Sequence, residues 1–286
     1  MKILVTGAYG QLGRSLSKNK NESIEFLRTG KNIPLGEKGI HLDILDRINL
    51  RDIINLWSPD ILINLAALTN VDFCEKNPFL AQEINAKGVK NICDFFHGKI
   101  IQISTDYVFN GEKGPYSEND KVAPLSVYGA TKLEAEKIVM SHSSRNLILR
   151  ANVLYDFHTQ SKASFLNWVV NSLQRKKPIK VVNDQINNPT WTQSMAKIIL
   201  SSIENNLNGI YHWGDSEFLS RYEFALKIAR SYKLDTNLIS PILTKELHQV
   251  APRPLNSGLK ADKILKVLNI HQPRIDDCLK KIILNK

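Results

Sequence analysis

A tyrosine and a lysine four residues apart, Tyr128 and Lys132, open a helical pattern in the stretch VYGATKLEAEK, residues 127–137. Positions i and i+4 share one face of a helix, so the phenol and the ammonium point the same way. A phenol becomes a useful proton donor at neutral pH when a nearby cation lowers its pKa. The pair is therefore a candidate for acid–base chemistry, although a packed tyrosine and a solvated lysine would give the same spacing.

A glycine-rich loop, GAYGQLG, follows the first predicted strand, Lys2–Thr6. Its G-x-x-G-x-x-G spacing predicts a dinucleotide site, because glycines let backbone N–H groups approach a pyrophosphate at the start of a helix. The loop residues expected at the cofactor are Gly7, Tyr9, Gly10, Gln11, Leu12 and Gly13.

The end of the second predicted strand indicates which cofactor is used. Arg28 stands where an acidic residue would bind the adenosine ribose of NAD(H). A guanidinium cannot accept a hydrogen bond from the 2′-hydroxyl, but it pairs well with a 2′-phosphate. This charge favours NADP(H), with NAD(H) possible and a solvated loop arginine as the alternative. Asp43 and Ile44 are expected near the adenine.

A nicotinamide cofactor would define the reaction in which Tyr128 and Lys132 take part. Hydride transfer to a ketone builds negative charge on the carbonyl oxygen, which Tyr128 can protonate while Lys132 lowers the pKa of the phenol and holds the nicotinamide ribose. Thr105, after the predicted strand Lys99–Ile103, is expected to orient the carbonyl, because ligands collect at the carboxyl ends of parallel strands.

The elements that position these residues alternate between strand and helix. Short apolar runs suit strands buried on both faces, so the first half predicts an α/β fold with a Rossmann-like, doubly wound parallel sheet. The predicted strands are 2–6, 24–27, 60–65, 99–103 and 146–150, and the predicted helices are 11–18, 46–57, 78–96 and 126–141. We assign residues 1–153 to an NAD(P)-binding domain and 154–286 mainly to a smaller α+β substrate-binding region. That region carries predicted strands at 179–182 and 209–212, and its helix near 192–204 could pack back on the first domain.

The bulk properties narrow the class of protein. The formal net charge is +10, but the basic residues are spread along the chain, so we do not expect nucleic acid as a partner. The three cysteines lack disulfide or metal-ligand spacing, and no metal is expected. The chain enters a strand at once and has no apolar run long enough to span a membrane. We therefore expect a cytoplasmic protein without a membrane partner, either a monomer or a homodimer.

Seven stretches together resemble the extended short-chain dehydrogenase/reductases, and within them the dTDP-4-dehydrorhamnose reductase family. They are GAYGQLG, LINLAALTNVDFCE, STDYVFNG, PLSVYGATKLEAE, NDQINNPTW, GIYHWG and RPLNSGL. The resemblance implies NADPH-dependent reduction of the C4 ketone of dTDP-4-dehydro-L-rhamnose, or of a close dTDP-4-keto-6-deoxy sugar, in polysaccharide biosynthesis.

The resemblance also implies roles for single residues. Thr105, Tyr128 and Lys132 would form the catalytic triad, and Ala66, Ala67 and Thr69 would line the cofactor. Thr69, Val71, Asp106 and Tyr107 would border the sugar. The nucleotide-diphosphate end of the pocket would be formed by Asn183, Asp184, Gln185 and Arg253.

Two positions depart from the family pattern. Val153 stands where the family usually has a tryptophan that packs on the sugar, and losing that surface should reshape sugar recognition. Ser15 replaces a glutamate that some members use for a metal at a dimer contact, so neither is carried over. Two other functions stay open: a reductase or epimerase of another nucleotide sugar, and a non-catalytic NADP-binding regulatory subunit resembling methionine adenosyltransferase β.

Overall fold

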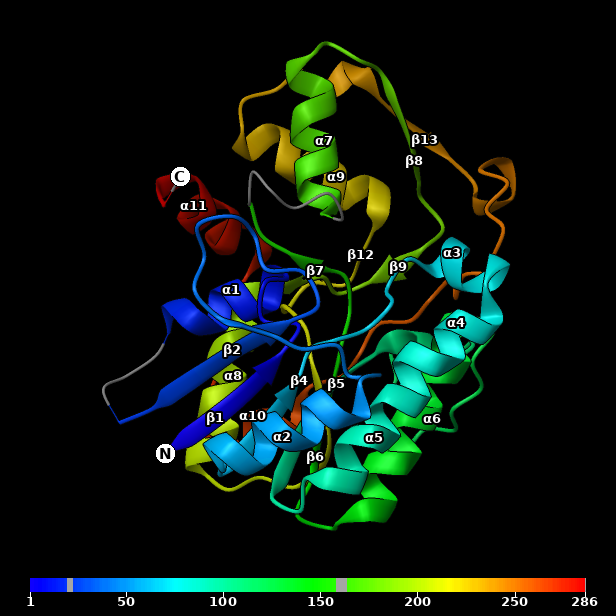
Figure 1. Cartoon of the computed structure of the whole chain (residues 1–286). Helices are drawn as coiled ribbons and strands as arrows, with labels where there is room; N and C mark the ends of the chain where they lie inside the picture. Colours follow the sequence, from blue (N-terminus) through cyan, green and yellow to red (C-terminus); the bar gives the residue numbers. More distant parts are fainter. Residues whose placement is uncertain (20–22, 158–163, 286) are drawn as a thin grey trace.

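The computed structural model of the chain describes residues 1–19, 23–157 and 164–285. A seven-stranded, wholly parallel sheet lies at its centre in the order β11-β6-β5-β4-β1-β2-β3 (Figure 1). The strands are β1 (Lys2–Thr6), β2 (Glu25–Gly30), β3 (Ile40–His41), β4 (Ile61–Asn64), β5 (Lys99–Thr105), β6 (Leu147–Ala151) and β11 (Gly209–Trp213). The order reverses between β1 and β4, which is the switch point where doubly wound sheets bind their ligands. The predicted fold class is confirmed.

The central strands are apolar on both faces, and alternate residues feed two different cores. Ile3 and Val5 of β1 pack into one core, whereas Leu4 between them packs into the other. The two-residue repeat of a strand explains this division, because successive side chains point to opposite faces.

Helices cover both faces of the sheet (Figure 1). On one face lie α2 (Arg47–Trp57), α5 (Gly88–Phe95) and α6 (Val127–His142), and on the other lie α1 (Gln11–Lys18), α8 (Thr192–Glu204) and α10 (Asp262–Leu268). Short helices α3 (Val71–Lys76) and α4 (Pro78–Gln82) precede α5. Among the described residues, no helix combines the length and the apolar character needed to cross a membrane.

The single helix predicted over 78–96 is divided in the structure. A π-helical turn, Glu83–Lys87, separates α4 from α5. It carries the buried Asn85, whose Oδ1 accepts from the Leu68 N–H at 2.8 Å and whose Nδ2 donates to the Leu68 carbonyl at 3.1 Å. π turns are common at functional sites, and this one anchors the loop that follows β4.

A second core builds the upper part of the molecule in Figure 1. It is formed by α7 (Phe165–Gln174), α9 (Arg221–Ser231) and α11 (Ile275–Leu284) with the parallel strands β8 (Ile179–Val182) and β13 (Ile239–Ile242). Two small ladders accompany it: β7 (Leu154–Tyr155) with β10 (Thr190–Trp191), and β9 (Ile186–Asn187) with β12 (Leu219–Ser220). Short 3₁₀ turns lie at Asp106–Val108, Thr236–Leu238 and Thr244–Glu246.

The second half of the chain also contributes to the central sheet. The strand predicted at 209–212 is β11, which pairs with β6 from Gly209 opposite Leu147 to Trp213 opposite Ala151. We expected this segment in the smaller region, because its apolar pattern marks a strand but not its partner. Met195 and Ile199 of α8 belong to the same core as β1. The division at residue 153 stays a prediction.

Candidate active site

The structure brings Thr105 and Tyr128 together at the carboxyl end of β5. Ser126 begins α6 by accepting from the Gly129 N–H at 3.2 Å, which places Tyr128 in the first turn. A Cβ added at Gly129 would collide with the Tyr107 carbonyl oxygen, so glycine lets α6 approach the turn that follows Thr105. The Thr105 hydroxyl lies close enough to Tyr128 to lower the pKa of the phenol, against the larger effect of burial.

Lys132 lies one turn beyond Tyr128 and is 4% exposed. Its ammonium donates to the Ile103 carbonyl at 2.7 Å. Burial lowers the pKa of Lys132 to about 8, and the nearby Glu136 carboxylate opposes this shift. The lysine is thus held beside β5, beneath the face that carries Tyr128.

The electrostatics of Tyr128 differ from the prediction. We expected Lys132 to lower the pKa of the phenol, but burial raises it, with a smaller opposing effect from the Thr105 hydroxyl. The groups that shift the Tyr128 pKa do not include Lys132, whose ammonium donates to the Ile103 carbonyl. Neutral Tyr128 therefore keeps its proton at physiological pH, as a proton donor requires.

Asp106 is buried beside Thr105. Its side chain is 1% exposed and accepts from the Thr105 hydroxyl at 3.0 Å and from the Ser257 hydroxyl at 2.5 Å. Burial raises the pKa of Asp106 to about 6, against the lowering effect of both hydroxyls. The sugar contact expected for Asp106 stays a prediction, and the observed bonds also suit a residue that positions Thr105.

The glycine loop forms a tight turn between β1 and α1. Gly7 has φ +63°, and an added Cβ would lie 2.7 Å from the Ala66 nitrogen, so this position requires glycine. Gly10 forms the start of α1, while the Leu12 side chain packs into the core. The buried Gln11 Oε1 has no hydrogen-bond partner among the described residues. The glycine turn leaves room for a pyrophosphate, and Gln11 Oε1 could accept a hydrogen bond from a dinucleotide.

Arg28 lies at the predicted ribose corner, but it is already paired. Its guanidinium stacks on the Tyr9 ring at 4.6 Å, and its Nη2 contacts Glu37 Oε2 at 2.5 Å. The other oxygen of Glu37 contacts Arg14 Nη1 at 2.5 Å. Nothing in the sequence pattern marked Arg14 or Glu37, because the contact joins a helix to a loop.

The other residues predicted to bind the cofactor lie in the segments after β3 and β4. Asp43 pairs with Lys31 at 2.7 Å and accepts from the Leu45 N–H, whereas the Ile44 side chain is buried in the core. Ala66 N–H donates to Asn64 Oδ1 at 3.2 Å. Ala66 and Ala67 are half-buried and Thr69 is exposed, in the loop held by Asn85.

An arginine pair borders the predicted sugar side. Arg253 Nη2 contacts Asp72 Oδ1 at 3.0 Å, next to Val71 at the start of α3. Arg221, which the sequence analysis missed, lies near enough to the Tyr107 side chain for the two groups to shift each other's pKa. The Tyr107 ring in turn meets the Tyr128 ring edge-on, with centroids 5.7 Å apart. Two cations thus lie near the candidate proton donor.

The other predicted substrate residues differ in burial. Gln185 is 6% exposed and donates to Thr244 Oγ1 and Gln249 Oε1, while Asp184 accepts from Thr244; Asn183 is exposed. Val153 is half-buried and adopts φ +25°, a region that disfavours a β-branched side chain. Strained backbone of this kind gathers at functional sites.

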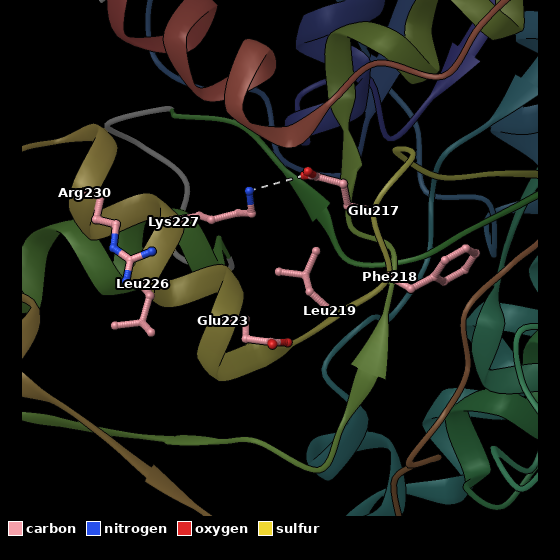
Figure 2. A pocket seen from close by; sticks show the side chains of 7 residues that line it. All are labelled: Glu217, Phe218, Leu219, Glu223, Leu226, Lys227 and Arg230. Atoms are coloured by element: carbon pink, nitrogen blue, oxygen red, sulfur yellow. Dashed lines mark ion pairs between the residues drawn. The ribbon is translucent and has the colours of Figure 1, made fainter.

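A pocket of about 500 Å³ lies elsewhere, between α9 and the loop before it (Figure 2). Its lining residues are Glu217, Phe218, Leu219, Glu223, Leu226, Lys227 and Arg230. Lys227 is paired with Glu217 at 3.5 Å and with Asp276 at 2.8 Å, so its charge is balanced. None of the predicted site residues lines this pocket.

Within the described residues, no cluster of three or more His, Cys, Asp or Glu side chains could hold a metal ion. All three cysteines are free and buried.

Known proteins share this architecture over the whole chain. The family described as the RmlD substrate binding domain matches residues 1–285. A dTDP-4-dehydrorhamnose reductase from Aggregatibacter actinomycetemcomitans is 31% identical over 296 residues, which cover 98% of each chain. The crystal structure of dTDP-4-dehydrorhamnose reductase from Bacillus anthracis str. Ames, in complex with NADP, matches with a TM-score of 0.91 and 30% identity, covering 100% of this chain and 99% of that one.

A third relative carries a different name. Methionine adenosyltransferase 2 subunit beta from Xenopus tropicalis is 31% identical over 278 residues, 93% of this chain and 82% of its own. The family match spans nearly all residues and agrees with the resemblance stated from the motifs. The chain belongs to the RmlD substrate-binding family.

Proposed function

We propose that the chain is an NADPH-dependent reductase that reduces the C4 ketone of dTDP-4-dehydro-L-rhamnose, or of a close dTDP-4-keto-6-deoxy sugar, in polysaccharide biosynthesis. The observation that carries this proposal is the placement of Tyr128, in the first turn of α6, near enough to Thr105 for the threonine hydroxyl to lower the pKa of the phenol, one helical turn from the buried Lys132. Reductases among the relatives support the substrate class. The free, buried cysteines suit a reducing compartment, so we place the reaction in the cytoplasm.

The residues of the chain divide the work. When bound, NADPH supplies the hydride, and the turn at Gly7 and Gly10 would hold its pyrophosphate at the start of α1. Tyr128 donates its proton to the ketone oxygen. Thr105 orients that oxygen once its hydroxyl rotates away from Asp106. Lys132, whose ammonium donates to the Ile103 carbonyl one turn from Tyr128, would hold the nicotinamide ribose.

The arginines recognise the nucleotide-diphosphate end of the substrate. Arg253 has a planar guanidinium that suits a diphosphate, and it is 8% exposed beside Asp72. Arg221 lies close enough to Arg253 for their charges to interact. We propose that these two cations draw the nucleotide diphosphate into the site, so that the sugar ketone meets Tyr128.

A second candidate rests on the similarity to methionine adenosyltransferase 2 subunit beta. In that case the chain would bind NADP without turning over a sugar. The meeting of Thr105, Tyr128 and Lys132 favours the enzyme, because a non-catalytic subunit has no chemical need for all three.

The test follows the loss of NADPH absorbance with dTDP-4-dehydro-L-rhamnose, while the product is identified by mass spectrometry. Stoichiometric NADPH loss with a reduced sugar nucleotide supports the reductase. Isomerisation without net NADPH loss would instead show an epimerase. Binding of NADPH without turnover on a panel of 4-keto sugar nucleotides would move the chain to the non-catalytic candidate.

A further inference from the structure

One carboxylate bridges two arginines at the ribose corner. Glu37 lies in the loop between β2 and β3, and each of its oxygens contacts one guanidinium, of Arg14 on α1 and of Arg28 on β2, at 2.5 Å. The three side chains are 17–26% exposed, so solutes can reach them. The hydrogen bonds from Arg28 and Arg14 lower the pKa of Glu37 although burial acts to raise it, and the group is ionised at neutral pH.

The two arginines are held in place without Glu37. The Arg28 guanidinium lies over the Tyr9 ring at 4.6 Å, and Arg14 Nε donates to the Tyr9 carbonyl at 3.1 Å. Tyr9 itself donates to the Lys38 carbonyl at 3.0 Å. Buried Arg28 Nε finds no acceptor among the described residues. Both guanidinium groups would therefore stay in position to bind another anion, and Arg28 Nε could donate a further hydrogen bond to it.

Glu37 sits on a segment that can move. Its N–H closes a turn by donating to the Pro34 carbonyl at 3.0 Å. The turn contains Gly36, at φ +81° with open space around it, and the exposed Leu35. Surface turns of this kind rearrange at little cost, whereas Arg14 and Arg28 belong to regular elements.

The two cofactors present different groups at this corner. The 2′-phosphate of NADPH needs cations, and its oxygens can replace the carboxylate oxygens between the guanidinium groups. The 2′-hydroxyl of NADH needs an acceptor, which in NAD-binding folds is an acidic residue. Resting on the proposed function, we propose that Glu37 selects between the cofactors: it accepts from the 2′-hydroxyl of NADH, and it must leave Arg14 and Arg28 before the 2′-phosphate of NADPH can pair with them.

Binding of adenosine fragments tests this without the reaction. Adenosine 2′,5′-bisphosphate and 5′-AMP are titrated calorimetrically into wild type, Glu37→Gln and Arg28→Met. We expect Glu37→Gln to bind the bisphosphate about tenfold tighter and 5′-AMP several-fold weaker, because the competing anion and the acceptor charge are both lost. Arg28→Met should weaken only the bisphosphate. Glu25→Gln, at the other end of β2, is the control for charge and should change neither.

The outcomes separate the two proposals. If wild type prefers the bisphosphate and Glu37→Gln leaves both affinities unchanged, the cofactor site stands and the role of Glu37 is overturned. If Glu37→Gln weakens both fragments equally, Glu37 only shapes the loop and the inference also falls. If wild type binds neither fragment, the dinucleotide site itself fails, and the proposed reductase fails with it.

Discussion

Glu136 on α6 and Arg150 on β6 form a two-point ion pair inside the protein. Arg150 Nε lies 2.9 Å from Glu136 Oε1, its Nη2 lies 2.7 Å from Oε2, and both side chains are 3% exposed. Arg150 also contacts His212 Nε2 at 3.3 Å. Glu136 is one turn beyond Lys132 and is the group that opposes the lowering of the lysine pKa. The ion pair therefore connects Arg150 of the central sheet to Glu136, the residue that raises the pKa of Lys132 in the candidate site.

Glu136→Gln should act on both stability and the pH profile. Removing one partner leaves Arg150 buried without its counter-charge, which costs about 3–5 kcal/mol in unfolding free energy by urea denaturation. The pKa of Lys132 should fall further below its present value of about 8, so turnover should decline at a lower pH than in wild type.

The double variant Glu136→Gln/Arg150→Met is the control for that prediction. It removes both charges, so much of the stability should return while the altered pH profile stays. A wild-type pH profile in both variants would show that Glu136 is only structural.

Tyr128→Phe should fold and bind NADPH but lose turnover by about 10²–10⁴-fold, because the ketone oxygen loses its proton donor. Binding is followed by NADPH fluorescence and turnover by its oxidation. Tyr211→Phe, on β11, makes the same change at a ring that contacts Lys263 and none of the described residues predicted for the site, and it should keep full activity. Near-normal turnover of Tyr128→Phe would remove Tyr128 from the mechanism.

Val153→Asn should raise the unfolding free energy by about 1 kcal/mol, because asparagine tolerates positive φ and valine does not. The backbone here is held by the Thr190 N–H, which donates to the Val153 carbonyl at 3.2 Å, so the conformation should persist. Val153→Ala keeps some of the strain and should gain less. A loss of stability in Val153→Asn that matches Val153→Ala would show that the strain carries no cost.

Asp215→Asn should change how stability depends on pH. Asp215 is fully buried, and burial raises its pKa to about 7 despite the Tyr155 hydroxyl that donates to it at 2.5 Å. A raised pKa means that the folded state keeps a proton that the unfolded state loses above about pH 4, so wild type loses stability as pH rises from there to about 7. The asparagine variant lacks this loss, which amounts to about 1.4 kcal/mol per pH unit at most.

The comparison is made as the difference between the two unfolding free energies from pH 4 to 8, since other carboxylates titrate equally in both proteins. The difference should move in favour of Asp215→Asn up to about pH 7 and then level off. Parallel curves would show that the folded protein does not hold the Asp215 proton.

Local patterns predicted the first half well. The strand Lys2–Thr6 and the helix Gln11–Lys18 have the predicted bounds, because the apolar period and the flanking residues act within each element. The helix expected from the Tyr128–Lys132 spacing is present for the same reason, as part of α6. What failed depends on contacts between distant elements: the place of β11, the π turn at Asn85 and the paired state of Arg28.

Side-chain direction was also beyond the sequence. Asp106 directly follows Thr105, so the sequence could place it near the candidate site. Its hydrogen bond with Ser257 could not be predicted, because Ser257 lies 151 positions further along the chain. Arg221 could not be predicted as a site residue either. It follows the helix cap Ser220, and an arginine in that position is expected to lie in solvent unless the residues packed against it are known.

The pairing of β11 with β6 has a consequence for synthesis of the protein. On the ribosome, β6 is complete long before β11 emerges, and all its residues are buried in the finished fold. Until then the nascent chain exposes an apolar strand with an unpaired edge, the feature that other strands join during aggregation. Truncation before residue 209 should therefore yield an insoluble fragment rather than a free cofactor-binding module. By pairing with β6, β11 covers the edge that the first half of the chain leaves open.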